Sequence, residues 1–166
     1  MQPVPPERMP GERNLDGTAA HDQALDELIA NAARIVSIFD KNLGRAFNSP
    51  QRCDLMRQLL LARRTNRIYI VLHETANITR DCPRLIMLLK HFSHAITIHQ
   101  TLPAARCVYD PFAVADDTLF VHRFHYDGMR GAASIGDIAN TRVLIKRFDE
   151  IWQASYPAIA ATTIGL

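Results

Sequence analysis

The sequence contains no run of about 18 apolar residues, which is the length that a membrane-spanning helix requires. Residues 1–18 hold Pro3, Pro5, Pro6 and Pro10 among charged side chains, and they lack the apolar segment of a secretory signal. These absences predict a protein that neither crosses a membrane nor enters a secretory route. We therefore expect a cytoplasmic location and no membrane partner.

Cysteine is scarce as well, and Cys53, Cys82 and Cys107 are an odd number without paired spacing. This pattern predicts reduced thiols, two of them in the core, and no disulfide framework. His91 and His94 have a ligand-like spacing, but no cysteine or carboxylate stands beside them at ligand spacing. A structural zinc site takes four ligands, so we expect neither a metal nor a cofactor.

Lysine is rare, because 16 of the 19 basic residues are arginine. Residues 1–30 hold two arginines and six acidic residues, a net charge of −4, whereas residues 31–166 hold 17 basic and 11 acidic residues, a net charge of +6. Arginine suits bidentate contacts with phosphate and carboxylate groups. The basic residues do not form the dense stripe of a dedicated nucleic-acid-binding protein, and a codon preference for arginine is an alternative explanation of their number.

Helical and β-branched segments alternate along the first two thirds of the chain. Residues 1–20 are rich in proline and charge, which predicts a disordered tail. Helices are expected after it, capped where Ser49-Pro50 or Asp81-Cys82-Pro83 begins one, and strands where short β-branched runs occur. The expected elements are helices at 20–33, 49–64 and 81–91 and strands at 34–39, 67–72 and 95–99. Their order predicts parallel strands joined by right-handed crossovers.

A hairpin and a long helix are expected to close the domain. Apolar and polar residues alternate on both sides of Asp116-Asp117 within Cys107–Arg123, a pattern typical of two strands joined by a tight turn. Ser134–Ser155 is predicted to be the longest helix, and Tyr156-Pro157 ends it. We expect one domain at residues 21–157, followed by a loose tail at residues 158–166.

This succession of elements resembles one half of a phospholipase D-like domain. The closing segment Ile138–Ser155, I-A-N-T-R-V-L-I-K-R-F-D-E-I-W-Q-A-S, is similar to the A-x-x-L-x-x-x-F-x-x-x-W-x-x-S ending of such domains. The resemblance covers roughly Ala24–Pro157. It implies an α/β fold with a mixed, mostly parallel sheet flanked by helices. It also implies a homodimer, because similar single-half relatives pair to bring two signatures together.

The signature of the active family members, H-x-K-x-x-x-x-D, is degraded in this chain. Aligned on the hairpin, its His falls on Asp110, its Lys on Phe112 and its Asp on Asp117. The resemblance implies a His nucleophile and Lys side chains that hold the phosphate oxygens. An aspartate in place of the nucleophile repels a phosphodiester, and a phenylalanine cannot hold its oxygens. We therefore expect a pseudoenzyme.

Several charged residues follow predicted strands, where ligands bind in open α/β sheets. Convergence of these side chains in one cleft would indicate a ligand site, and scattering would indicate a scaffold. The candidate ligand-binding residues are Asp40, Arg45, Glu74, Asp110, Asp117, Arg123 and His125.

Three functions are compatible with this pattern. The first is a non-catalytic binding or regulatory module for a partner protein or an anionic ligand. The second is weak nucleic-acid binding through a set of four arginines, Arg45, Arg63, Arg64 and Arg123. The third is a phosphodiesterase-type hydrolase that uses His125, Arg123 and Asp127, which share one face of an extended strand.

Overall fold

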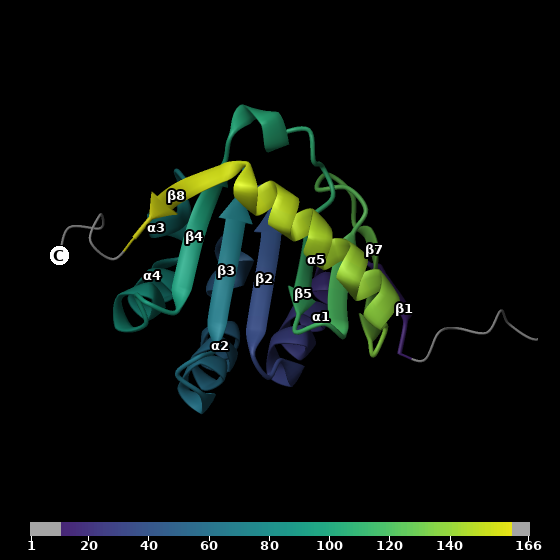
Figure 1. Ribbon diagram of the computed structural model, residues 1–166, viewed down its shortest axis with the longest axis horizontal. Coiled ribbons are helices and arrows are strands. Elements are labelled where there is room, and N and C mark those ends of the chain that lie inside the picture. Colours follow the sequence, from purple (N-terminus) through teal and green to yellow (C-terminus); the bar gives the residue numbers. More distant parts are fainter. Residues whose placement is uncertain (1–10, 161–166) are drawn as a thin grey trace, which may run out of the picture.

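An eight-stranded mixed sheet forms the centre of the computed structural model, which describes residues 11–160 (Figure 1). The strand order is β1-β7-β6-β5-β2-β3-β4-β8. The pairs β2/β3 and β3/β4 are parallel and the other five pairs are antiparallel. The strands are β1 (Arg13–Asp16), β2 (Ile35–Asp40), β3 (Arg67–Leu72), β4 (Ile96–Thr101), β5 (Phe112–Ala115), β6 (Leu119–Arg123), β7 (Arg130–Ile135) and β8 (Ser155–Ile159). The expected mixed α/β fold is confirmed, although the sheet is mostly antiparallel.

The sheet is more antiparallel than expected because it contains three strands that the sequence pattern does not reveal. β1 carries a single buried apolar residue, Leu15. β7 has the sequence R-G-A-A-S-I, whose small residues give no β-branched run, and β8 is an edge strand that contains Pro157, where the missing N–H is tolerated. The expected disordered tail is therefore wrong for residues 13–20, which form β1 and the start of a helix, while residues 1–10 lie outside the described part. Of the expected C-terminal tail, residues 158–159 belong to β8, and residues 161–166 are not described.

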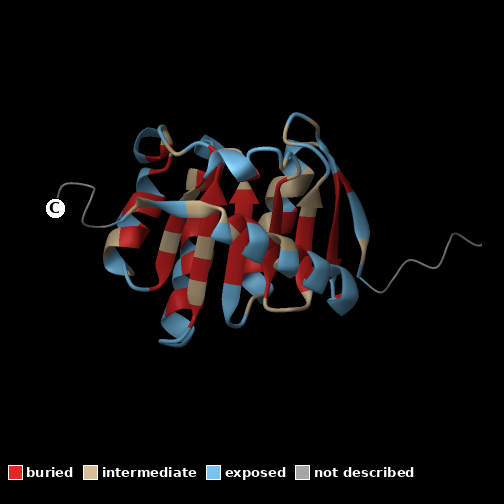
Figure 2. Ribbon diagram, turned by 45° about the horizontal axis from the view of Figure 1, so that its top comes forward, coloured by how far each residue is buried: buried red, intermediate tan, exposed pale blue. Residues whose placement is uncertain are grey.

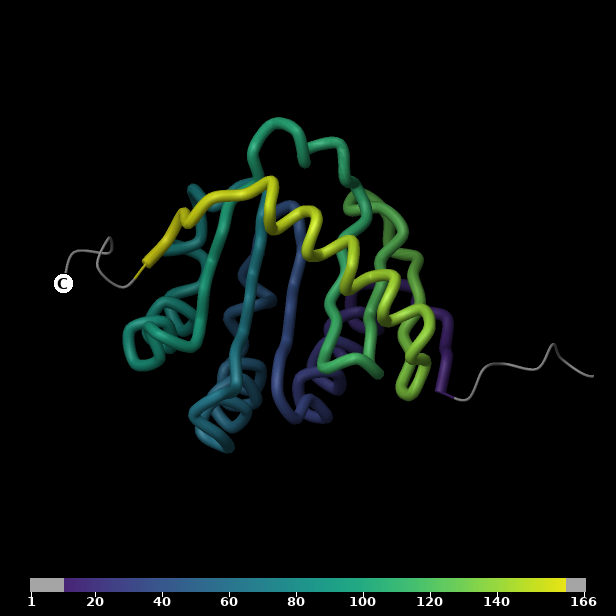
Figure 3. The backbone as a smooth tube through the Cα atoms, viewed as in Figure 1, coloured from purple at the N-terminus to yellow at the C-terminus, as the bar shows by residue number. Residues whose placement is uncertain are grey.

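Helices cover the two faces of the sheet unequally. Figures 1 and 3 show α1, α2 and α4 on one face, while α5 crosses the other face diagonally. In the part of the chain that is described, no helix is both long and apolar enough to cross a membrane. The helices are α1 (Thr18–Asn31), α2 (Pro50–Ala62), α3 (Ile78–Asp81), α4 (Pro83–His91) and α5 (Ile138–Gln153), with short 3-10 turns η1 (Arg45–Asn48) and η2 (Pro103–Ala105).

The buried residues form two clusters, one on each side of the sheet (Figure 2). Alternation along β2 separates them, because Val36 and Ile38 belong to the cluster under α1 and α2 whereas Phe39 belongs to the cluster under α5. Two of the three free cysteines, Cys53 and Cys82, are buried in the structure, as predicted.

Helix α5 closes the second cluster with the residues of its F-x-x-x-W pattern. Phe148 is buried, and the Trp152 ring stacks on His99 of β4 with 3.6 Å between ring centroids. The helix begins where Asp137 Oδ1 accepts the N–H of Asn140 at 3.0 Å, a hydrogen bond typical of an aspartate N-cap. It is shorter than predicted because Ser134 belongs to β7.

The turn between β5 and β6 is fastened to the beginning of β2 by Asp116. This residue adopts a left-handed backbone with φ of 54°, which aspartate tolerates better than most residues. Its carboxylate accepts the N–H groups of Ala33, Arg34 and Ile35 at 2.9, 2.9 and 3.0 Å. Asp117 beside it has a side chain that is 43% exposed and lies 3.8 Å from Arg142. Asp116 is therefore the aspartate that fixes the hairpin, rather than the Asp117 that the signature alignment selects.

We expect Asp116→Ala to lower the free energy of unfolding by about 2 kcal/mol, because three N–H groups lose a charged acceptor and alanine disfavours a positive φ. Asp117→Ala is the matched control, and its exposed ion pair predicts a loss below about 1 kcal/mol. Urea denaturation of both variants measures the difference. Equal losses in the two variants would show that the Asp116 hydrogen bonds do not hold the turn.

Candidate functional site

The topology brings five strand ends together at one edge of the sheet, here called the carboxyl edge. The parallel strands β2, β3 and β4 end there, and the antiparallel neighbours place the start of β5 and the end of β6 beside them. Pairing continues past the strands, since the N–H of His73 bonds the carbonyl of Asp40 at 3.2 Å and that of Glu74 bonds the carbonyl of Lys41 at 2.8 Å. Asp40 and Glu74 therefore lie on neighbouring strand ends.

A hollow of about 260 Å³ at this edge, here called the edge pocket, combines two cations with one carboxylate. The Lys41 ammonium lies 4.9 Å from the centroid of the Tyr126 ring, a cation–π distance. Arg106 enters from the connection after η2, and Glu74 is the acidic member. The lining residues are Lys41, His73, Glu74, Gln100, Arg106 and Tyr126.

His73 lies at the floor of the edge pocket, and its ring is held by two hydrogen bonds. Its Nε2 is 2.7 Å from the carbonyl oxygen of Val108, and its Nδ1 is 2.7 Å from Oγ1 of Thr101. Because a carbonyl can only accept, Nε2–H is the donor, and in the neutral ring Nδ1 accepts from the threonine hydroxyl. This buried histidine ties β3, β4 and the following connection together, so it has a structural role.

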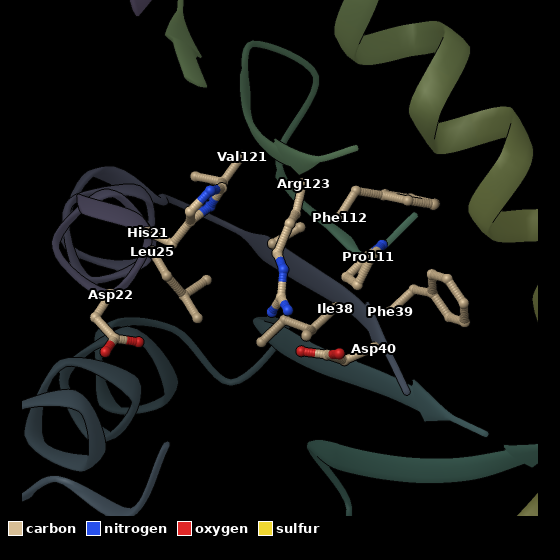
Figure 4. A pocket seen from close by; sticks show the side chains of 11 residues that line it. His21, Asp22, Leu25, Ile38, Phe39, Asp40, Pro111, Phe112, Val121 and Arg123 are labelled. Carbon is tan, nitrogen blue, oxygen red and sulfur yellow. The ribbon is translucent and has the colours of Figure 1, made fainter. Parts of the chain in front are cut away.

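Two further hollows of about 100 and 240 Å³ adjoin the edge pocket and share Asp40 and Arg123; together they are here called the Asp40 pocket. Figure 4 shows the guanidinium of Arg123 reaching from β6 toward the carboxylate of Asp40, with His21 and Asp22 of α1 on the other side. Lys41 and Tyr126 line both the edge pocket and the larger of these two hollows, so the hollows are neighbours; the edge pocket and the Asp40 pocket are together called the cleft.

Arg123 is also the anchor of the loop at residues 124–129. Its guanidinium donates to the carbonyl of Gly128 at 2.7 Å and to the carbonyl of Tyr126. From the α1 side, the carbonyl of Met129 accepts the N–H of Gly17 at 3.1 Å. The loop is therefore held at both ends. Two of the guanidinium N–H donors of Arg123 are used for these bonds to the loop carbonyls.

Burial raises the pKa of Asp40 to about 6, although the Lys41 N–H at 2.7 Å and the charge of Arg123 favour the carboxylate. Burial also lowers the pKa of His21, whose Nε2 lies 3.0 Å from the carbonyl oxygen of Met129. A neutral imidazole that donates this hydrogen bond is consistent with that shift. The Asp40 pocket thus places a carboxyl that changes charge near neutral pH next to a fixed guanidinium.

Arg52 lines the same pocket, although its place on α2 predicts a solvent-exposed face. It is 2% exposed, its Nε donates to Asp26 at 2.8 Å, and its Nη2 lies 3.5 Å from Asp22. The two aspartates neutralise this buried cation. The helical periodicity of α2 gave no indication that Arg52 is buried, because Asp22 and Asp26 belong to another helix, α1.

Asp110 lies at the carboxyl edge, but its side chain bonds residues on the face of the sheet that α5 covers. Arg147 of α5 contacts both of its oxygens, at 2.5 and 2.7 Å, and His122 Nε2 lies 2.7 Å from Oδ2. Burial opposes ionisation of Asp110, yet the bonds from Arg147 and His122 hold its pKa below the usual range. The carboxylate is fully engaged in tying β5, β6 and α5 together.

The remaining predicted site residues lie outside the cleft. The Arg45 side chain is 85% exposed and lies 3.6 Å from Asp81. Asp117 lies at the opposite edge of the sheet, in the β5–β6 turn. His125 lies beyond the end of β6, in the loop, where its ring packs on Tyr109. The seven candidates therefore converge in part: Asp40, Glu74 and Arg123 line the cleft.

Metal ligands do not gather in this region. Within residues 11–160, no group of three or more His, Cys, Asp or Glu side chains is arranged to hold a metal ion.

Asp40→Asn is expected to raise the free energy of unfolding at pH 7 by about 1–2 kcal/mol. The ordinary value of 3.8 lies below the folded-state pKa of about 6, so between these values the folded protein binds more protons than the unfolded chain and loses stability as pH rises. The stability gained by Asp40→Asn should shrink toward pH 4, where Asp40 is protonated. Urea denaturation of the variant and the wild-type chain from pH 4 to pH 7 measures this difference in stability. A difference that does not change with pH would contradict the raised pKa of Asp40.

Known structures share this fold at low sequence identity. Nuc, a phospholipase D family member from Salmonella typhimurium, matches with a TM-score of 0.61 and 10% identity over 92% of this chain and 100% of Nuc. NucT from Helicobacter pylori matches with a TM-score of 0.57 and 11% identity over 89% of this chain and 98% of NucT. TrmBL2, an archaeal chromatin protein with a novel mode of DNA binding, matches with a TM-score of 0.62 and 13% identity over 92% of this chain, which spans 56% of TrmBL2. At these identities the matches establish the phospholipase D-like fold alone.

Sequence comparison gives a family without an activity. No curated protein matches the chain. Residues 17–161 match the domain of unknown function DUF7931, a span that runs from the start of α1 through β8 and leaves out β1. The chain therefore belongs to the DUF7931 family, and its fold is that of the phospholipase D-like proteins.

Proposed function

We propose that the chain is a non-catalytic phospholipase D-like domain that binds an anionic ligand at the carboxyl edge. The observation that carries this proposal is the edge pocket, where Lys41 and Arg106 line a hollow of about 260 Å³. Pockets that hold a small ligand are concave and contain a few convergent polar groups. Two cations at one strand edge favour an anion such as a phosphate group.

The residues in the signature positions support a binding role over catalysis. Asp110 is engaged by Arg147 and His122, and Phe112 is buried under α5. The Asp110 carboxylate is therefore not free to attack a phosphorus atom, and Phe112 has no polar group that could hold a phosphate oxygen. His73, the histidine nearest to the edge pocket, is hydrogen-bonded through both nitrogens.

The geometry gives little support to a hydrolase built from His125, Arg123 and Asp127. β6 ends at Arg123, so the three residues do not follow one extended strand. His125 Nδ1 accepts the backbone N–H of Asp127 at 3.1 Å, and the Asp127 side chain is 76% exposed. Arg123 meanwhile donates to the loop carbonyls. Arg123 and His125 are thus each engaged with the backbone of the same loop.

Nucleic-acid binding is a second candidate, favoured by the fold that the chain shares with the chromatin protein TrmBL2. The four arginines predicted for this role do not form one surface. Arg63 and Arg64 follow α2 and precede β3, at the edge opposite to Arg123. A nucleic acid would therefore be bound at the carboxyl edge, through the same cations as any other anion.

Inorganic pyrophosphate is a suitable probe of the proposed site. We expect Lys41→Gln and Arg106→Gln each to weaken its binding about tenfold, because each variant removes one charged donor. Glu74→Gln should strengthen binding, because it removes a negative charge from the same pocket. Isothermal titration calorimetry at low salt measures all three, with Lys90→Gln at the far end of α4 as the control.

Two results would contradict this function. The first is pyrophosphate binding that does not respond to Lys41, Arg106 or Glu74. The second is turnover of an activated phosphodiester by the purified protein that His125→Ala abolishes, since it would show a hydrolase instead of a binding domain.

The resemblance to single-half relatives further predicts that two copies of the chain associate. Light scattering at tens of micromolar protein tests this prediction through the molar mass. The expected result is twice the mass of one chain, and a monomer under these conditions would dispose of the homodimer.

A further inference from the structure

Three aromatic rings stand next to the edge pocket and form the aromatic cluster: Tyr109, His125 and Tyr126. Tyr109 and His125 are stacked with an interplanar angle of 24° and 5.8 Å between centroids. Tyr126 lies 4.8 Å from His125 and 5.7 Å from Tyr109. Tyr109 is 48% exposed and the His125 side chain 50% exposed, so ring surface remains open to solvent.

The aromatic cluster is held in place by its backbone. The N–H of Tyr126 bonds the carbonyl of Tyr109 at 2.8 Å, which joins the loop to the segment before β5. The Arg123 guanidinium donates to the carbonyl of Tyr126, and the N–H of Gly128 bonds the carbonyl of His125 at 3.0 Å. A platform fixed in this way loses little conformational freedom when a ligand stacks on it.

Tyr126 joins the aromatic cluster to the cations. Its ring packs on the other two aromatic residues and also lines the edge pocket beneath the Lys41 ammonium. The cationic side chain of Lys41 and the aromatic cluster therefore lie next to each other. Exposed aromatic rings beside a basic groove are how proteins bind single-stranded nucleic acids, with the bases on the rings and the phosphates on the cations.

We infer that the edge pocket and the aromatic cluster together bind a nucleoside phosphate, either free or within a single strand. The phosphate lies at Lys41 and Arg106, and the base stacks on the exposed faces of Tyr109 and His125. This inference rests on the proposed anion site, because the phosphate position is the same. It adds a base-recognition surface that the anion proposal does not need.

Calorimetric titrations with ribose 5-phosphate and adenosine 5′-monophosphate separate the two contributions. For the wild-type chain, we expect the nucleotide to bind about tenfold more tightly than the sugar phosphate, which is the effect of one stacked base. Tyr109→Ala should lower the affinity for the nucleotide to that for the sugar phosphate. Tyr109→Phe should retain the difference, because it keeps the ring, and His94→Ala at the opposite edge is the control.

The outcomes distinguish the two proposals. Absence of binding by either ligand defeats the anion site and this inference together. Equal affinity for the two ligands, with both weakened by Lys41→Gln, leaves the anion site standing and overturns the base-stacking inference. Because Tyr109 is about half exposed, circular dichroism of Tyr109→Ala is expected to show an unchanged fold, and the Tyr109→Phe result tests the ring if it does not.

A single-stranded oligoadenylate of about 12 nucleotides and its duplex identify the source of the nucleotide. Tighter binding of the single strand than of the mononucleotide, lost in Tyr109→Ala, identifies a nucleic acid as the ligand. Equal binding of the two identifies a free nucleotide. Duplex binding as tight as that of the single strand and insensitive to Tyr109→Ala would overturn the inference, because it would show backbone contacts without stacking.

Discussion

The guanidinium of Arg123 is the contact on which the arrangement of the carboxyl edge depends. It binds the carbonyls of Tyr126 and Gly128, which fixes the loop that follows β6, and it faces the carboxyl of Asp40 at the end of β2 (Figure 4). Together with the hydrogen bond from the Tyr126 N–H to the Tyr109 carbonyl, this anchor fixes Tyr126 between Lys41 and the other two rings of the aromatic cluster. A residue that the sequence marks as a ligand contact is thus first of all the organiser of the site.

An ion pair and an aromatic contact join the hairpin to α5. They involve Asp110 and Phe112, which the alignment expected from the sequence places at the nucleophile and lysine positions of the signature. The first holds Arg147 and His122, and the second packs at 6.4 Å between ring centroids from Phe148 of α5. Both positions now join the hairpin to α5.

The sequence predicted the elements that its own local pattern specifies. β3 was predicted with its observed bounds because its six residues alternate inside a β-branched run, and the caps at Ser49 and Asp137 are local hydrogen bonds. β1 and β8 were missed because they pair with strands far along the chain, and β7 was missed because its small residues give no strand pattern. The site followed the same rule. Asp40 and Glu74 were found from strand ends, and Lys41 directly follows Asp40, whereas Arg106 and Tyr126 join them only through the tertiary fold.

The Asp40 carboxyl gives this edge a dependence on pH that a simple basic pocket would lack. Because burial raises its pKa to about 6, Asp40 is ionised at neutral pH, and its charge partly cancels that of Arg123. Protonation near pH 6 removes this negative charge and leaves the cations in excess. We expect the ionised carboxyl to repel an anion at the neighbouring edge pocket, so by linkage protonation of Asp40 would favour the anion. The coupling would act through like charges, because Asp40 itself does not line the edge pocket.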